Sequence, residues 1–178
     1  REPGGGVSEI RFRDAVIAVG SVVRPPPVAF PGARVYDTET IWTAPSARPG
    51  ETALILGAGV SGIEIASYLA LRGVKVHVVE PLTDLLPAAD RDAAKRLRRA
   101  LEAIGEKAVH FSFGSVVESA TTSTCRIAAV ASGGGDCGPR DPMRDLDFDF
   151  VETKVWRIPS TPKLGLGPAG IPTREKYP

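Results

Sequence analysis

The centre of the chain alternates between short apolar runs and an amphipathic stretch. Residues 53–56 form an uninterrupted apolar run, which predicts a buried strand. Residues 60–72 place small and apolar side chains at helical spacing, and Gly73 follows where a helix favours a left-handed residue. The valine-rich residues 74–79 predict a second strand. This part of the chain therefore predicts a strand–helix–strand unit.

The alternation continues further along the chain. Residues 89–104 predict an amphipathic helix, with Leu97, Leu101 and Ile104 on one face and arginines on a solvated face. Residues 109–113 predict a third strand, which completes a βαβαβ succession. Such alternation is typical of α/β domains with a parallel sheet.

After residue 113 the helical pattern stops. Residues 115–119, 125–131 and 147–151 predict short antiparallel strands, and the glycine-rich residues 132–144 predict a loop. A last short strand is expected over residues 152–157. The predicted fold class is α/β, a Rossmann-like βαβαβ parallel sheet with an antiparallel β-meander.

The first fifty residues are less regular. Residues 9–19 alternate and then become apolar, which predicts a strand. Residues 24–27 read Arg-Pro-Pro-Pro, a stiff extended connector of the kind found between domains. Asp37 or Thr38 is expected to cap a short helix that runs to about residue 43.

A glycine motif follows the first predicted strand of the βαβαβ unit. Gly57 allows a sharp turn out of the strand, and Gly59 allows the backbone to approach a pyrophosphate without an intervening Cβ. Gly62 allows the helix to pack closely, with its N-terminal amides facing the phosphates. Glu80 ends the second strand, where a carboxylate accepts the hydroxyls of an adenine ribose. The glycines alone also suit a βαβ unit in which they serve packing, but the position of Glu80 favours a dinucleotide site.

The same acid favours NAD over NADP. A 2′-phosphate beside Glu80 would bring like charges together, which costs several kcal/mol. An NADP site typically carries arginine just after the second strand. The first cation after Glu80 is Arg91, which a rearrangement could bring nearer.

The composition narrows the class of protein. Hydrophobic residues make up 43% of the chain, and 22 basic residues nearly balance 21 acidic ones. No basic stripe suggests nucleic acid, and no apolar run reaches the ~20 residues that cross a bilayer. With no secretory leader pattern at its start, the chain is expected to be cytoplasmic and to bind no membrane.

The remaining candidate residues are interpreted as structural. Cys125 and Cys137 lie twelve positions apart, a spacing that favours two unpaired thiols over a redox pair and fits no metal motif. His77 and His110 lie in apolar runs and are expected to be structural. The chain starts at Arg1 and its only methionine is Met143, so it is interpreted as a piece of a longer product or as a processed one.

Four segments in this order resemble the central third of the FAD-dependent pyridine nucleotide–disulfide oxidoreductases, with dihydrolipoamide dehydrogenase the most similar member. The segments are VIAVGSVVRPPPVAFPG, LILGAGVSGIEIASYLALRGVKVHVVE, LLPAADRDAAKRLRRALEAIG and WRIPSTPKLGLGPAGI. They are similar, respectively, to the family's crossover out of the FAD domain, its NAD fingerprint, the following loop and helix, and the return toward the FAD domain.

The resemblance implies roles by position. Residues 57–62 would hold the NAD pyrophosphate, Glu80 the adenosine ribose, and Val60 a place near the nicotinamide. Glu64 falls where the family has a glutamate that pairs with a lysine beside the flavin, although its spacing alone suits an ordinary exposed helix acid. Trp156 replaces a glycine near the nicotinamide end and would reshape that pocket. The implied cofactor contacts are Gly57, Ala58, Gly59, Val60, Ser61, Gly62, Glu64, Glu80 and Trp156.

The resemblance also implies what lies elsewhere. The family's CxxxxC disulfide, its FAD fingerprint and its C-terminal His-Glu base are not in this chain, so no catalytic residue is assigned here. Residues 1–27 would be a remnant of the FAD domain with its crossover, residues 28–160 the NAD-binding domain, and residues 161–178 a tail returning to the FAD domain.

The implied function is passage of hydride between NADH and FAD in a dihydrolipoamide dehydrogenase-like flavoprotein. FAD would be bound mostly by segments outside the chain. The implied partners, besides NAD(H), are those FAD and dimerisation segments or a complementary subunit, and the chain itself is expected to be monomeric. The alternatives are a non-catalytic NAD-binding module, or the same domain of an NADH oxidase, a coenzyme A disulfide reductase or a mercuric reductase.

Overall fold

The computed structural model describes residues 9–43, 47–105, 108–130, 144–153 and 157–172. Contacts between Cα atoms divide the chain into two compact units. One unit is Val23–Arg157, and the other combines Arg1–Val22 with Ile158–Pro178. The predicted sheet, its helices and the meander all lie in the first unit.

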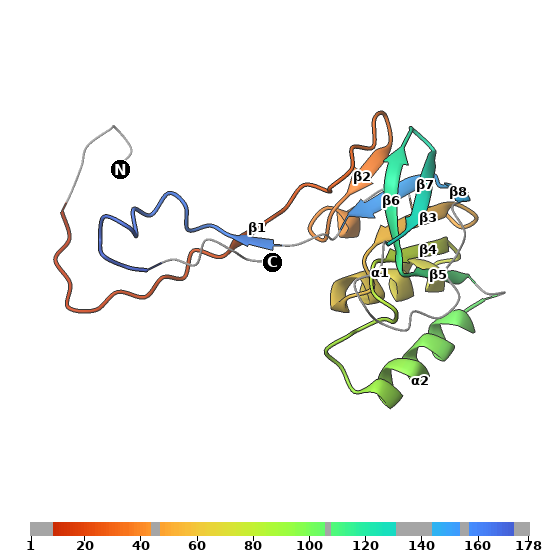
Figure 1. The fold of residues 1–178 in the computed structure, drawn as a ribbon, viewed down its shortest axis with the longest axis horizontal. Coiled ribbons are helices and arrows are strands. Elements are labelled where there is room, and N and C mark those ends of the chain that lie inside the picture. The colour runs from red at the N-terminus through yellow and green to blue at the C-terminus, as the bar shows by residue number, and fades with distance from the viewer. Residues whose placement is uncertain (1–8, 44–46, 106–107, 131–143, 154–156, 173–178) are drawn as a thin grey trace. The chain divides into compact units, whose positions relative to one another are not determined.

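A parallel sheet forms the centre of the larger unit (Figure 1). Its strands lie in the order β2-β9-β3-β4-β5. Helices α1 and α2 connect β3 to β4 and β4 to β5, which confirms the predicted βαβαβ succession. The bounds are β2 Arg34–Tyr36, β3 Thr52–Leu56, α1 Val60–Leu71, β4 Lys75–Glu80, α2 Arg91–Glu102, β5 Val109–Phe113 and β9 Phe150–Thr153.

The helices begin and end where the sequence provides suitable residues. Gly73 follows α1 with a φ of 81°, the left-handed conformation that its missing Cβ permits. The Asp90 carboxylate accepts hydrogen bonds from the backbone N–H groups of Asp92 and Ala93 and so caps α2. Helix α2 is therefore shorter at both ends than the predicted helix over residues 89–104.

Alternate positions along the strands face two different cores. Ala53 and Ile55 of β3 pack with the buried face of α1, in a core that also includes Val76 and Val78 of β4. Leu54 and Leu56 of β3 face the opposite side. There they pack in a second core, which includes Val117, Ile127 and Phe148. The sheet is thus covered on both faces.

The second face carries an antiparallel meander. It consists of β6 (Ser115–Ala120), β7 (Thr124–Ala129) and β8 (Arg144–Asp147), in the order β6-β7-β8. The meander confirms the predicted antiparallel part of the fold. The predicted loop over residues 132–144 lies outside the described residues apart from Arg144, which begins β8.

The predicted antiparallel strand over residues 147–151 is wrong. The chain leaves the meander after Asp147, buries Phe148 in the second core, and enters the parallel sheet as β9. Asp149 fixes this change, because its backbone N–H donates to the Thr52 carbonyl and its carboxylate accepts from the Thr52 N–H. Of the predicted last strand over residues 152–157, Glu152 and Thr153 belong to β9, residues 154–156 lie outside the described residues, and Arg157 begins β10.

The predicted strand over residues 9–19 is also wrong. The chain has no strand over residues 9–20, and Ile10, Phe12 and Val16 are exposed. Alternation alone does not make a strand where the described residues offer no partner strand. The first strand is instead β1 (Ser21–Val23), which pairs with β10 (Arg157–Pro159).

The short helix near residue 40 is confirmed as a single turn. It is the 3-10 helix η1, Ile41–Thr43. The Asp37 carboxylate accepts from the backbone N–H groups of Glu39 and Thr40, as its predicted capping role requires. Across the described ranges, no helix is both long and apolar enough to span a lipid bilayer.

Candidate functional site

The glycine motif forms the turn between β3 and α1. Gly57 adopts a φ of 104°, which only glycine tolerates well, and its N–H donates to the Val79 carbonyl at the end of β4 at 2.8 Å. Gly59 is extended and precedes α1, and no side chain caps this end of the helix among the described residues. The first amides of α1 are therefore oriented as an anion-binding helix terminus requires.

Gly62 is required by the closeness of α1 to this turn. A Cβ atom built on Gly62 would lie 2.1 Å from the Gly57 carbonyl oxygen. That oxygen belongs to the backbone of the turn, which is itself tied to β4. Gly62 therefore permits the close packing of the helix that the motif predicts, and the group that it approaches is the backbone of the turn.

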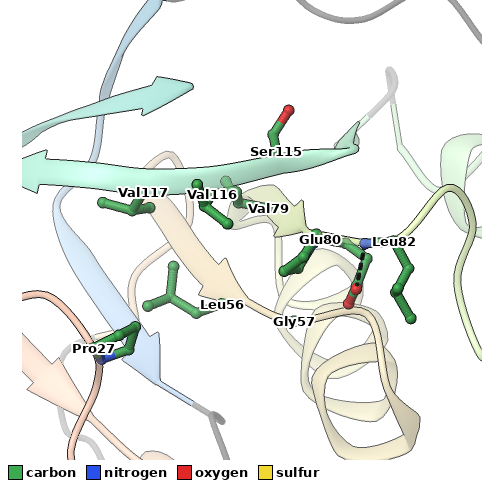
Figure 2. Close-up of a pocket in the computed structure, with 10 residues that line it drawn as sticks. Pro27, Leu56, Gly57, Val79, Glu80, Leu82, Ser115, Val116 and Val117 are labelled. Atoms are coloured by element: carbon green, nitrogen blue, oxygen red, sulfur yellow. Dashed lines mark hydrogen bonds between the residues drawn. The ribbon is translucent and has the colours of Figure 1, made fainter. Parts of the chain in front are cut away.

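Glu80 lies beside the same turn, with only 7% of its surface exposed. Its Oε2 accepts from the Ala58 N–H at 2.6 Å. Its Oε1 accepts from the Leu82 N–H at 2.9 Å, the bond drawn as a dashed line in Figure 2. The two bonds fix the carboxylate between the glycine turn and the loop after β4. Each carboxylate oxygen retains a second lone-pair direction for a further donor.

A cavity of about 380 Å³ opens next to Glu80 at the carboxyl ends of β3 and β4. Figure 2 shows its walls, which come from four separate parts of the chain. Most of them are apolar. The lining residues are Pro27, Leu56, Gly57, Val79, Glu80, Pro81, Leu82, Ser115, Val116 and Val117.

Sequence reasoning missed most of this lining. The sequence pattern predicts only a meander strand for Ser115, Val116 and Val117, and only a connector for Pro27. No motif marks these residues. The available signal is positional, because residue 115 begins a strand two residues after β5 ends at Phe113, at the same edge of the sheet as Glu80.

A second cavity, of about 310 Å³, lies at the carboxyl ends of β2 and β9. Tyr36, Asp37 and Thr153 contribute to it, together with the connector from Val23 to Pro26. In the strand order, β9 lies on one side of β3 and β4 on the other. The two cavities thus flank the point where the chain connections reverse direction, the place where open α/β sheets bind ligands.

The other predicted contacts are dispersed. Val60 is 62% exposed on the first turn of α1, and Ser61 beside it is half-buried. Glu64 is exposed on α1, which suits both a flavin-side acid and an ordinary helix acid. Trp156 lies outside the described residues. The structure therefore brings Gly57, Ala58, Gly62 and Glu80 together, with Gly59, Val60 and Ser61 on the adjoining turn of helix.

The histidines lie among the strands, apart from the glycine turn. His77 Nε2 and Ser112 Oγ are 2.9 Å apart, and Arg144 donates to the same Ser112 oxygen at 2.9 Å. His77 and His110 stack with ring centroids 6.2 Å apart. These contacts link β4 and β5 to β8. Within the described ranges, no three residues among His, Cys, Asp and Glu are grouped as a metal site requires.

Cys125 is expected to be chemically inert in the folded chain. It is 1% exposed, and burial, together with the charges of Asp145 and Asp147, raises the pKa of its thiol to about 11. Only the thiolate reacts, so a Cys137→Ser chain, in which Cys125 is the sole cysteine, should react with a disulfide reagent only after denaturation. Rapid labelling of the native Cys137→Ser chain would contradict the burial of Cys125.

Comparison with known proteins identifies a protein family that matches this chain. Residues 2–177 match the family described as pyridine nucleotide-disulphide oxidoreductase. Dihydrolipoyl dehydrogenase 3 of Pseudomonas putida is 30% identical over 176 residues, which cover 97% of this chain and 35% of that protein. Dihydrolipoyl dehydrogenase 2 of Haloarcula marismortui is 33% identical over 178 residues, which cover 97% of this chain and 34% of the relative.

Solved structures show the same similarity. The HOCl-induced flavoprotein disulfide reductase RclA from Escherichia coli superposes with a TM-score of 0.66 at 27% identity. The alignment covers 88% of this chain and 33% of that structure. Histamine dehydrogenase from Rhizobium, at 16% identity and a TM-score of 0.65, shares the fold. The chain spans about a third of the length of the curated relatives that it matches.

Proposed function

The chain belongs to the pyridine nucleotide-disulphide oxidoreductase family, and on this premise we propose that it is the NAD(H)-binding part of a dihydrolipoamide dehydrogenase-like flavoprotein. The observation that carries the proposal is the position of Glu80. Its carboxylate is fixed against the glycine turn and lines the apolar cavity at the carboxyl edge of the sheet. Both halves of an adenosine, the ribose and the base, find suitable partners there.

The adenosine end is proposed to occupy the cavity beside β4. The fixed Glu80 oxygens would accept the ribose hydroxyls, and Val116, Val117 and Leu82 would contact the base. Mostly apolar walls with few polar groups are typical of sites for nucleotide-sized ligands. The same carboxylate would repel a 2′-phosphate, so the proposed cofactor is NAD in preference to NADP.

The pyrophosphate is proposed to lie over the N-terminus of α1. Gly59 and Ser61 would present backbone N–H groups there, beside Gly57 and Ala58, whose own N–H groups are bonded to Val79 and Glu80. The positive end of the helix dipole favours an anion at this place. The close approach of Gly62 to Gly57 supports this placement, because it fixes the helix terminus against the turn. The residues present therefore fit a dinucleotide at this edge.

The nicotinamide end is proposed to pass Val60 and to cross β3 toward β9. Val60 is exposed on the first turn of α1, so its side chain is accessible to a ligand that leaves the glycine turn. Trp156, which follows β9 by three residues, is proposed to shape that end of the site, and Glu64 to face the flavin side. Nicotinamide and flavin cofactors supply the hydride chemistry when bound, while the protein binds and orients them.

FAD is proposed to be held mainly by segments outside this chain. In this arrangement residues 1–27 are a remnant of the FAD domain with its crossover, residues 28–160 bind NAD, and residues 161–178 return toward the FAD domain. The inert Cys125 supports the assignment of the redox disulfide to another segment, because a buried thiol of raised pKa is a poor nucleophile.

Titration of the 178-residue chain with NADH tests the proposal. We expect saturable binding, followed by quenching of tryptophan fluorescence, and competition by ADP-ribose. NADPH should bind more weakly. Absence of NADH binding by the folded chain would contradict the nucleotide site, and a yellow chain that oxidises NADH with a dye acceptor would contradict the placement of FAD in other segments.

A further inference from the structure

The loop between β4 and α2 contains a backbone conformation that its side chain disfavours. Leu86 has a φ of 48°, and within the described ranges it is the only residue besides glycines with a positive φ. For an L-residue with a branched side chain this conformation is uncommon, and Pro87, which follows, restricts the backbone of Leu86 further. Such conformations persist where the surrounding contacts impose them.

The contacts of Leu86 explain why the conformation is retained. Its N–H donates to the Ala58 carbonyl at 3.0 Å, and its carbonyl accepts from the Ala89 N–H at 2.8 Å. The neighbouring Leu85 is buried in the core between the sheet and α1, and the Leu86 side chain packs against the same core. The side chains of Leu85 and Leu86 therefore anchor the loop to the core, and one backbone hydrogen bond connects the loop to the glycine turn.

Ala58 is consequently held on both of its peptide groups. Its N–H donates to the Glu80 carboxylate, and its carbonyl accepts from Leu86. A trans peptide directs its carbonyl and its N–H to opposite sides, and the chain has no cis peptide bond among the described residues. Fixing the Ala58 carbonyl therefore also fixes the direction of the Gly59 N–H, which belongs to the same peptide plane and lies at the start of α1.

We propose that Leu86 is a positioning residue for the phosphate-binding turn. Its left-handed backbone lets the chain turn on toward Ala89 while its N–H donates to Ala58, and this bond orients the Ala58–Gly59 peptide toward a bound pyrophosphate. The inference rests on the proposed NAD(H) site and adds to it a residue outside the glycine motif. The Leu86 backbone carries the role, and the Leu86 side chain contributes only packing.

Two substitutions separate the backbone from the side chain. Leu86→Val keeps an apolar side chain but opposes a positive φ, whereas Leu86→Gly removes the side chain and accepts a positive φ. We expect Leu86→Val to weaken ADP-ribose binding about fivefold, the effect of losing one net hydrogen bond, while adenosine binding changes by less than about twofold. Leu86→Gly should bind ADP-ribose as tightly as the unaltered chain, within about twofold.

The opposite order would overturn the inference. If Leu86 only packed against the core, Leu86→Gly would be the more damaging change, and both variants would weaken adenosine and ADP-ribose alike. Failure of the unaltered chain to bind ADP-ribose would instead refute the proposed function. The two failures are therefore distinguishable in one set of titrations.

Hydrogen exchange of the unaltered chain provides a test that needs no variant. The Leu86 amide should exchange slowly, as a hydrogen-bonded loop amide does, and should become more protected when ADP-ribose binds. Fast exchange of this amide in both states would overturn the inference, whether or not Leu86→Val folds.

Discussion

Substitution of Gly62 by alanine is expected to abolish NADH binding and to destabilise the fold by about 3 kcal/mol, in the range of severe overpacking. The new Cβ would lie 2.1 Å from the Gly57 carbonyl oxygen. The turn cannot yield easily, because the Gly57 N–H is bonded to β4 and the Ala58 N–H to Glu80. In a helix with open space around the glycine, the same change would stabilise the fold by roughly 1 kcal/mol. A loss of stability would therefore show that α1 packs closely against the turn, and a gain would show that it does not.

Chemical denaturation and NADH titration measure the two parts of this prediction. Gly167→Ala is the matched control, because nothing lies within 4 Å of its added Cβ and its φ is not positive. The Gly167→Ala chain should keep the stability and the affinity of the unaltered chain. If the Gly62→Ala chain unfolds at the same denaturant concentration as the unaltered chain and binds NADH with the same affinity, α1 does not approach the turn so closely.

Glu80 is expected to affect both stability and the choice of cofactor. Glu80→Ala would leave the Ala58 and Leu82 amides without their acceptor, and an unsatisfied buried group costs about 1–3 kcal/mol. Glu80→Gln keeps an oxygen acceptor for one of the two backbone amides, places an NH2 group against the other, and loses the charge. We therefore expect Glu80→Gln to fold, to bind NADH about tenfold more weakly, and to lose most of its discrimination against NADPH.

Parallel titrations with NADH and NADPH decide this prediction, with thermal unfolding of each variant measured beside them. Glu118→Gln is the matched control, since it removes an exposed carboxylate of β6 that does not line the cavity. It should change neither affinity. An unchanged preference for NADH in Glu80→Gln would refute the role of Glu80 in cofactor choice, even if its affinity for both nucleotides fell.

The local part of the fold could be predicted from the sequence because its signals are local. The βαβαβ succession follows from periodicity, and Gly57, Gly62 and Gly73 occupy positions where a missing Cβ is required. The strand β9 could not be separated from β8, because polar and apolar residues alternate from Asp145 through Phe150, across the end of β8 and into β9. The break depends on Asp149 and Thr52, which lie 97 residues apart.

The candidate site likewise contains residues that the sequence predicts and residues that only the structure reveals. Glu80 is predictable because its position after a strand is part of a motif. Leu86 lies in the segment LLPAADRDAAKRLRRALEAIG, but the pattern assigns it no role, because its role depends on a φ value and on one backbone hydrogen bond. The cavity walls from Pro27 and from β6 depend on tertiary packing. Such contributions become visible only when strands distant in sequence are placed at one edge of a sheet.

The position of β9 between β2 and β3 has a consequence for synthesis of the chain. Both neighbours of β9 emerge from the ribosome about a hundred residues before it, since Ala53 pairs with Phe150. Among the strands that the structure describes, only β9 pairs with β2, so until β9 is made β2 is unpaired and β3 has an open edge on that side. Pairing over such a separation is slow to form, so the nascent chain exposes an unpaired strand edge of the kind that chaperones bind.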